Sequence, residues 1–332
     1  MICVYGAGSV GCYVGGRLAA AGADVVFVGR ERIAAEVRAH GLRLTDLDGA
    51  DARVEEPRYE TDLAAAADAD LVLVTVKSAA TAEAAARLAP RLRPGTPVVS
   101  LQNGLRNTEV LRQGLPAAAA IPGMVACNVV HRGEGRFHRA TAGGLEVQAH
   151  PALDAHLAAF DRAGLPLALH DDLRGVQAGK LVLNLNNAVN ALSGLPLRTE
   201  LSQRAYRRVL ARAQREALAA FKAAGIIPAR TAGADPRLIP VVLGLPDALF
   251  ARVAARMLAV DPHARSSTRD DLESGRPTEV DHLNGEVVAL AAEHGTRAPV
   301  NERLTALVHE AEAGGRRDWS GPELLAAMVR PD

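Results

Sequence analysis

A glycine-rich hexapeptide near the N-terminus, Gly6-Ala7-Gly8-Ser9-Val10-Gly11, constrains the fold more than any other feature of the chain. It follows a short apolar segment, residues 2–5, predicted to be a strand, and it opens a predicted helix at residues 9–21. A dinucleotide-binding βαβ unit requires a strand, a glycine-rich turn and a helix in this order. Gly6 would permit the tight turn, Gly8 would let the backbone approach a pyrophosphate, and Gly11 would let the helix pack closely. The free N–H groups of the helix would then bind phosphate, and a purely structural glycine turn is the alternative.

The rest of the N-terminal half alternates between predicted strands and helices. Residues 71–76 form a continuous apolar run, which is typical of a strand buried on both faces of a parallel sheet. Further strands are predicted at 24–28, 97–101, 117–130, 144–148 and 165–169, and helices at 33–39, 81–88 and 107–113. This βαβ succession predicts a doubly wound α/β sheet of the Rossmann type.

The C-terminal half is predicted to be helical. Its helical patterns cover residues 172–192, 202–224, 235–243, 247–259, 279–294, 300–313 and 319–328. A domain boundary near residue 170 follows, with a nucleotide-binding domain at 1–170 and an all-α domain at 171–332. The long apolar helices at 235–259 could form the face of a homodimer.

Charge and composition exclude several classes of function. The 332 residues contain 38 Lys plus Arg and 38 Asp plus Glu, so no overall field favours nucleic acid or an anionic membrane. Aromatic residues make up only 3%, which argues against a base-stacking surface. Cys3, Cys12 and Cys127 have no metal-ligand spacing and no disulfide pattern, so we expect no metal and a reducing cytoplasm. A cleaved signal peptide would destroy the nucleotide site, and no apolar run is long enough to span a membrane.

The second predicted strand ends at Arg30, which indicates the type of nicotinamide cofactor. An acidic residue at this position would bind the ribose hydroxyls of NAD. An arginine instead suits a 2′-phosphate, through charge-assisted hydrogen bonds and stacking on adenine. NADPH is therefore favoured over NADH, and a solvated surface charge is the alternative for Arg30.

Two further loops follow the carboxyl ends of predicted strands, where ligands of such sheets bind. One contains Lys77 and the other contains Asn103. Both side chains could reach the nicotinamide end of the cofactor and the substrate. Each alone could also be a helix cap or a surface charge.

A polar stripe interrupts an apolar helix in the second half. At about 100° per residue, Lys180, Asn184 and Asn187 lie within roughly 60° of one another. A lysine on a mostly apolar helix is costly to bury, so desolvation would favour loss of its proton and suit it to act as a general acid. The alternative is a surface stripe on an amphipathic helix.

Together these motifs resemble the ketopantoate reductases (2-dehydropantoate 2-reductases). The resemblance rests on GAGSVG with Arg30, Val-Lys-Ser at 76–78, Leu-Gln-Asn-Gly at 101–104, Lys180-x-x-x-Asn184, and Ser266-Ser267 followed by Thr278-Glu279-x-Asp281-x-x-Asn284-Gly285. It covers nearly the whole chain. It implies a Rossmann domain, a helical C-terminal domain like that of 6-phosphogluconate dehydrogenase, and an active site in the cleft between them.

The resemblance also implies a role for each matching residue. Lys180 would protonate the carbonyl oxygen as hydride arrives, and Glu279 would hold the nicotinamide ribose and the geometry around Lys180. Asn103 would touch both nicotinamide and substrate. Asn184 and Ser267 would bind the carboxylate or hydroxyl of the 2-oxo acid. The remaining contacts to NADPH would come from Gly6, Ala7, Gly8, Ser9, Val10, Gly11, Arg30, Lys77 and the backbone of Val129.

The chain departs from the family pattern in three places. Ala188 stands where a second asparagine is common, and Leu197 or Arg198 stands where another is expected. Asn187 could substitute for the first, and Arg198 could anchor a carboxylate. The serine pair is followed by Thr-Arg-Asp-Asp in place of an apolar pair. Reduction of ketopantoate, reduction of another 2-oxo acid, and non-catalytic NADP binding therefore stay open, the last disfavoured by Lys180, Asn184 and Glu279 together.

Overall fold

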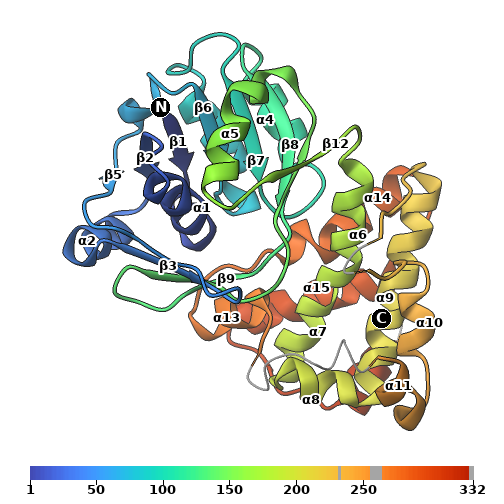
Figure 1. The fold of residues 1–332 in the computed structure, drawn as a ribbon. Coiled ribbons are helices and arrows are strands. Elements are labelled where there is room, and N and C mark those ends of the chain that lie inside the picture. The colour runs from blue at the N-terminus through green and yellow to red at the C-terminus, as the bar shows by residue number, and fades with distance from the viewer. Residues whose placement is uncertain (231–232, 255–263, 329–332) are drawn as a thin grey trace. The chain divides into compact units, whose positions relative to one another are not determined.

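The computed structural model describes residues 1–230, 233–254 and 264–328 and divides into two compact units, Met1–Leu173 and Arg174–Asp332 (Figure 1). The first unit contains a twisted sheet with helices on both faces. The second unit is largely helical. Each unit has its own hydrophobic interior and is described separately below.

The main sheet of the first unit has eight strands. Six of them, from β5 to β8, run parallel, whereas β11 is antiparallel to β8 and parallel to β12. The chain order reverses between β1 and β6, which is the topological switch point at which such sheets bind ligands. In spatial order the strands are β5 (Arg58–Glu60), β2 (Val25–Val28), β1 (Ile2–Tyr5), β6 (Leu71–Val74), β7 (Pro97–Leu101), β8 (Ala119–Val125), β11 (Leu145–Gln148) and β12 (Leu167–His170).

The two faces of this sheet bury separate apolar clusters, because successive strand residues point to opposite sides. Val4 of β1 packs with Cys12 in the cluster that also includes α1 (Ser9–Ala20), α2 (Glu31–His40) and α5 (Asp154–Arg162). Cys3, its neighbour in β1, packs in the opposite cluster with α3 (Thr81–Leu88) and α4 (Asn107–Gly114). Burial raises the pKa of the Cys3 thiol to about 12. The predicted doubly wound sheet is confirmed, with one antiparallel pair added.

A second sheet of four strands was not predicted. Its order is β4 (Asp51–Val54), β3 (Leu42–Asp46), β10 (Arg136–Arg139) and β9 (Val129–His131). These strands are short and rich in Arg and Asp, so they lack an apolar run, and β3 pairs in parallel with β10 from a distant part of the chain. The prediction of a single strand at 117–130 is also wrong. This segment forms two strands, β8 in the main sheet and β9 in the second sheet.

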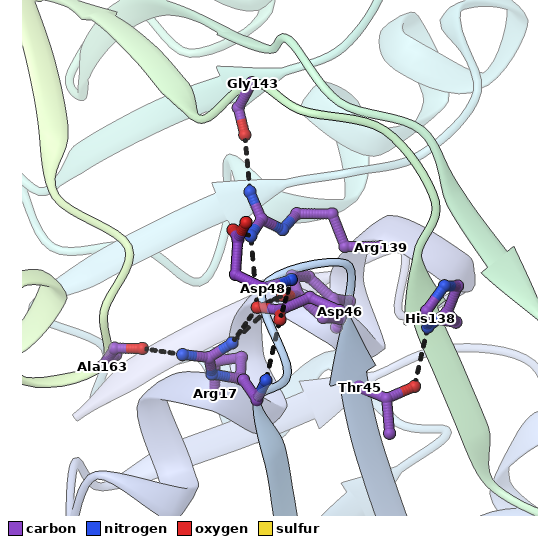
Figure 2. A network of polar contacts seen from close by, with 10 residues as sticks. Arg17, Thr45, Asp46, Asp48, His138, Arg139, Gly143 and Ala163 are labelled. Carbon is purple, nitrogen blue, oxygen red and sulfur yellow. Dashed lines mark hydrogen bonds and ion pairs between the residues drawn. The ribbon is translucent and has the colours of Figure 1, made fainter. Parts of the chain in front are cut away.

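A buried carboxylate joins the second sheet to the helix that follows the glycine turn (Figure 2). Asp46 Oδ2, at the end of β3, accepts hydrogen bonds from Arg17 Nη1 at 3.1 Å and Arg139 Nη2 at 3.2 Å. Its Oδ1 accepts from the backbone N–H groups of Asp48 and Ala50, both at 2.9 Å. Arg17 also donates to the carbonyl of Ala163 at 2.9 Å. The polar network thereby fixes α1 between the second sheet and the end of α5.

The helical unit is organised around α9 (Arg204–Ala223), which packs against α10, α14, α15 and α16 and also contacts α6, α7 and α8. The described helices are α6 (Arg174–Asn184), α7 (Asn186–Ser193), α8 (Leu197–Ser202), α9 (Arg204–Ala223), α10 (Ile239–Leu243), α11 (Asp247–Val253), α13 (Ser267–Glu273), the 3-10 turn η4 (Val280–His282), α14 (Asn284–Glu293), α15 (Pro299–Glu312) and α16 (Gly321–Ala327). Gly194, in the left-handed conformation at φ 63°, ends α7.

Three helix predictions need correction. The single helix expected at 172–192 is two, α6 and α7, although Leu185 between them keeps helical dihedral angles. The helix expected at 279–294 is preceded by the separate turn η4, and α13 was not predicted because its sequence is polar on most positions. The helix expected at 247–259 is described only to Val253, and residues 255–259 lie outside the described part of the chain.

Candidate functional site

The glycine turn after β1 has the backbone that the motif predicts. Gly6 has a φ of +91°, and a Cβ built there would lie 2.5 Å from the backbone nitrogen of Val76. A Cβ at Gly11 would lie 2.6 Å from Thr75 Oγ1, so helix and strand pack too closely for a side chain. A Cβ at Gly8 would meet only the carbonyl oxygen of Gly6, at 3.8 Å. No described protein atom requires a glycine at position 8 by close contact, which fits a position where a bound dinucleotide approaches the backbone.

The amide groups of this turn divide into two sets. The N–H groups of Gly6 and Ala7 both donate to the carbonyl of Val28, at 2.9 and 3.0 Å, and the Gly8 N–H donates to Gly6 at 2.6 Å. These three are used within the protein. No side chain of the described residues caps the N-terminus of α1, where Ser9 and Val10 are partly exposed. The first turn of α1 is therefore where the amides and the helix dipole are available to a phosphate.

Arg30 lies at the end of β2, in extended conformation immediately before α2. Its side chain is exposed and makes no ion pair with any residue in the described ranges. Tyr59 lies beneath this turn and donates a 2.6 Å hydrogen bond to the carbonyl of Ala7. A Cβ at Gly29 would lie 2.1 Å from the Tyr59 hydroxyl oxygen, so the chain passes close to that ring. Arg30 thus follows a strand whose Val28 carbonyl accepts from the glycine turn, and it is exposed to solvent.

The loops after β6 and β7 are joined by buried side chains. Gln102 accepts from Ser100 Oγ at 2.9 Å and donates to the Val76 carbonyl at 3.0 Å and to Thr81 Oγ1 at 2.8 Å. Thr81 in turn donates to Asn107 Oδ1 at 2.7 Å. In this network each of these polar groups has a partner, as buried polar groups require.

The same network fixes the backbone of Asn103. The Asn103 carbonyl accepts from Asn107 Nδ2 at 2.5 Å and from Ser78 Oγ at 3.0 Å. Ser78 directly follows Lys77, which is partly exposed, as is Asn103. The two loops that sequence reasoning singled out are therefore held together, with Lys77 and Asn103 beside the switch point. Val129, on β9, is buried in the same apolar cluster as Ala7.

In the helical unit, Lys180, Asn184 and Asn187 lie on a partly exposed face of α6 and α7. Leu183 shares this face, whereas Leu181, Val182, Leu185 and Val189 are buried. The predicted polar stripe is present because the helical dihedral angles continue through Leu185. Lysine and two amides on one helix face form a set that can bind and protonate an oxo acid.

Ser267 reaches the same face from α13. The Asn187 amide Nδ2 donates to Ser267 Oγ at 3.5 Å, and Ser267 is exposed. Ala188, where the family has an asparagine, is only 1% exposed and faces the interior. Leu197 and Arg198 lie at the start of α8, the first partly exposed and the second exposed. The structure thus places Asn187, and not residue 188, beside the serine.

Glu279 directly precedes η4, where it is partly exposed. The backbone around it is fixed by Glu312, which accepts from the Thr278 N–H at 2.7 Å, and by Thr278 Oγ1, which accepts from the Val280 N–H at 3.3 Å. His309 lies nearby, and hydrogen bonds to Glu312 and Asp281 raise its pKa.

No role was assigned from the sequence to the buried residues that support these side chains. Ser78, Gln102 and Ser266 belong to the quoted motifs, whereas Thr81, Asn107, Asn186, Asn190 and Glu200 were not singled out. Asn186 and Asn190 carried a usable signal, because polar residues four apart on an apolar helix face require buried partners. The partners themselves come from segments that no sequence pattern connects.

The described ranges of the chain contain neither a cluster of metal-binding side chains nor a membrane-spanning helix. No group of three or more His, Cys, Asp or Glu side chains there could hold a metal ion. Nor is any helix in those ranges both long and apolar enough to cross a membrane.

Comparison with known proteins agrees with this architecture. Residues 2–152 match the family described as "Ketopantoate reductase PanE/ApbA", and residues 172–312 match "Ketopantoate reductase PanE/ApbA C terminal". A 2-dehydropantoate 2-reductase of Halobacterium salinarum is 32% identical over 321 residues, which is 95% of this chain and 99% of the relative.

Solved structures give the same result. A PanE/ApbA family ketopantoate reductase of Ralstonia eutropha JMP134 is 31% identical, with a TM-score of 0.82 over 95% of this chain and 99% of that one. D-mandelate dehydrogenase, solved with NADH and anilino(oxo)acetate, shares the fold at 18% identity and a TM-score of 0.76, over 95% and 99% of the two chains. The chain belongs to the ketopantoate reductase PanE/ApbA family of oxidoreductases.

Proposed function

We propose that this protein catalyses the NADPH-dependent reduction of 2-dehydropantoate (ketopantoate) to (R)-pantoate, a cytoplasmic step toward pantothenate and coenzyme A. Family membership supports the reaction class. The observation that carries the proposal is the partly exposed polar face of α6 and α7, where Lys180 lies with Asn184 and Asn187. Ser267 Oγ lies 3.5 Å from the Asn187 amide nitrogen. We assign NADP binding to a domain at residues 1–170 and substrate binding to a domain at 171–332.

The first unit would hold the cofactor, which supplies the hydride. The uncapped first turn of α1, at Ser9 and Val10, would bind the pyrophosphate. Arg30 would bind the 2′-phosphate, since it is exposed and lies two residues after Val28, whose carbonyl accepts from the glycine turn. Lys77 and Asn103, whose loops are joined by hydrogen bonds, would line the nicotinamide end. The fit of the first unit to a dinucleotide rests on the open space over Gly8.

The second unit would hold the substrate and supply the proton. Asn187 and Ser267 would bind the carboxylate and hydroxyl groups, and Asn184 would orient the carbonyl oxygen. As the carbonyl carbon gains a hydride, its oxygen gains negative charge, and the Lys180 ammonium would give that oxygen a proton from Nζ. Glu279 would bind the nicotinamide ribose. The products are the 2-hydroxy acid and oxidised cofactor.

A panel of 2-oxo acids tests the proposal. The loss of NADPH absorbance is followed with 2-dehydropantoate, pyruvate, 2-oxoisovalerate and phenylglyoxylate, and each is repeated with NADH. The proposal expects the highest kcat/KM for 2-dehydropantoate with NADPH. NADPH binding without turnover of any oxo acid would identify a non-catalytic NADP-binding protein instead.

Reduction of a different 2-oxo acid is the second candidate. It is favoured by the buried Ala188 and the exposed Arg198, which replace or border positions where the family has asparagines. Loss of an amide that hydrogen-bonds a substrate hydroxyl removes discrimination for that hydroxyl. A higher kcat/KM for an oxo acid that lacks the hydroxyl of ketopantoate would establish this candidate.

We also propose that the protein forms a homodimer through residues 235–259, of which 255–259 lie outside the described part of the chain. Leu238, Val241, Leu249 and Val253 of this segment are between 46% and 61% exposed. Such apolar groups are typical of an interface. Light scattering during size-exclusion chromatography gives the mass directly, and a monomer at micromolar concentration would refute the proposal.

A further inference from the structure

A buried carboxyl group lies behind the proposed substrate face. Glu200, on α8, is 0% exposed, and its Oε2 accepts hydrogen bonds from Asn186 Nδ2 at 3.2 Å and Asn190 Nδ2 at 3.1 Å. No cation is among these partners, which are neutral amides of α7. An ionised carboxylate so placed would lack the compensation that a buried charge requires.

Its second oxygen indicates which form the group takes. Glu200 Oε1 and Asn186 Oδ1 are both buried and have no hydrogen-bond partner among the described residues. A proton on Oε1 would turn the carboxyl group into a donor, and Asn186 already binds this group through its amide nitrogen. Burial raises the pKa of Glu200 to about 8, which is consistent with a neutral acid.

The network continues from Glu200 to the proposed substrate groups. Asn190 links three segments, because its Nδ2 donates to Glu200 at 3.1 Å and to the Leu195 carbonyl at 2.9 Å, and its Oδ1 accepts the Ser266 N–H at 3.0 Å. Ser266 Oγ donates to the Asn187 carbonyl at 3.1 Å and accepts the Arg269 N–H at 3.2 Å. Ser266 is thus both the cap of α13 and the link from that helix to α7.

We infer that Glu200, as a neutral carboxylic acid, is a positioning residue that fixes Ser267 and Asn187 relative to one another through Asn190 and Ser266. The inference rests on the proposed function, in which Asn187 and Ser267 bind the oxo acid. Without the carboxyl group, Asn190 Nδ2 keeps only the Leu195 carbonyl, and the side chain that accepts from the α13 cap is held less firmly. Substrate affinity would fall, whereas binding of NADPH to the first unit would not change.

Three substitutions separate positioning from general stability. Glu200→Gln keeps the shape of the neutral acid and replaces the proton by an amide donor, so its KM for 2-dehydropantoate should stay within about twofold of wild type. Glu200→Ala should raise that KM by about tenfold or more, as expected for loss of a buried hydrogen-bonded group. Glu200→Asp, which retracts the carboxyl group by one methylene, provides the same readout if the alanine variant does not fold. In each variant the Kd for NADPH should be unchanged.

Glu216 provides the matched control. It is a partly exposed carboxyl group of the same unit, and it accepts hydrogen bonds from the backbone of Val300 and Asn301 on α15. Glu216→Ala should lower the melting temperature and leave KM unchanged. A wild-type KM in Glu200→Ala or Glu200→Asp, or an equal loss in Glu200→Gln, would overturn the inference. A wild-type enzyme that reduces no 2-oxo acid would instead refute the proposed function, and the inference with it.

Discussion

Replacing Asp46 by alanine should open the contact between the second sheet and the helix that follows the glycine turn. The Asp46 side chain is 5% exposed, and those of its partners Arg17 and Arg139 are 13% and 14% exposed. Removing one member of a buried ion pair costs about 3–5 kcal/mol, because the other charge stays buried without compensation. Arg17 keeps the Ala163 carbonyl and Arg139 keeps that of Gly143, so we expect the lower end, about 3 kcal/mol.

Hydrogen exchange measured by mass spectrometry localises this effect within the intact protein. Amides of residues 42–54 and 129–139 should lose protection by about a hundredfold in Asp46→Ala, which corresponds to the expected free-energy change. Asp48→Ala is the matched control, since Asp48 also pairs with Arg139 but is 78% exposed. Its effect should stay under about 1 kcal/mol. Equal protection in the two variants would refute the assignment of the contact to the buried carboxylate.

Acid should abolish the difference between wild type and Asp46→Ala. Although burial alone would raise it, hydrogen bonds from the Ala50 N–H and from Arg139 hold the pKa of Asp46 below its ordinary value. A lowered pKa in the folded state means that the stabilisation is complete above the unfolded-state pKa and is lost as pH falls through the folded-state pKa. The protection gained from Asp46 should therefore persist at neutral pH and decline only in acid.

Three other substitutions test the chemistry and the charge state of the site. Lys180→Ala should lower kcat by about two to four powers of ten without changing NADPH affinity. It should also remove the fall in activity at alkaline pH, and near-normal turnover would exclude Lys180 as the general acid. Arg30→Asp should weaken NADPH far more than NADH, and equal weakening would show that Arg30 does not bind the 2′-phosphate. Glu200→Gln should become more stable relative to wild type as pH rises. The contribution of the wild-type carboxyl group to the free energy of unfolding is complete below pH 4.5, its ordinary pKa, and is lost as pH rises through about 8. The difference in free energy of unfolding should approach about 5 kcal/mol, and a pH-independent difference would contradict a neutral buried acid.

The parallel strands could be predicted because a strand that is buried on both faces requires a nearly continuous run of apolar residues. Residues 71–74 have this character and residues 97–101 have it except at Ser100, and both strands are buried throughout. The second sheet could not be predicted from such a pattern. Only Leu42 and Leu44 of β3 are buried, and its neighbour β10 joins from a distant segment. Pairing between distant short strands is a property of the folded chain, and no local pattern contains it.

The candidate ligand-binding residues could be predicted from the sequence for a related physical reason. Lys180, Asn184 and Asn187 interrupt an apolar helix, and Lys77 and Asn103 follow the ends of buried strands, so each is a polar exception to its surroundings. Exceptions of this kind are informative because an uncompensated polar group is costly beside a core. Helical spacing already suggested Asn187 as the substitute, and the structure adds the surroundings of residue 188. Its alanine is buried, and the amide one residue earlier faces Ser267.

The supporting residues follow the opposite logic in both units. Asn107 and Glu200 are buried, so their sequence positions resemble ordinary core positions, and their roles depend on partners brought by other elements. Asn107 contacts the carbonyl of the residue it supports, whereas Glu200 acts through two intervening side chains. Each additional side chain between a supporting residue and the group it positions adds freedom of movement to that group. Substitution of Glu200 should therefore mainly weaken substrate binding, whereas substitution of Asn107 should move the backbone of Asn103 directly.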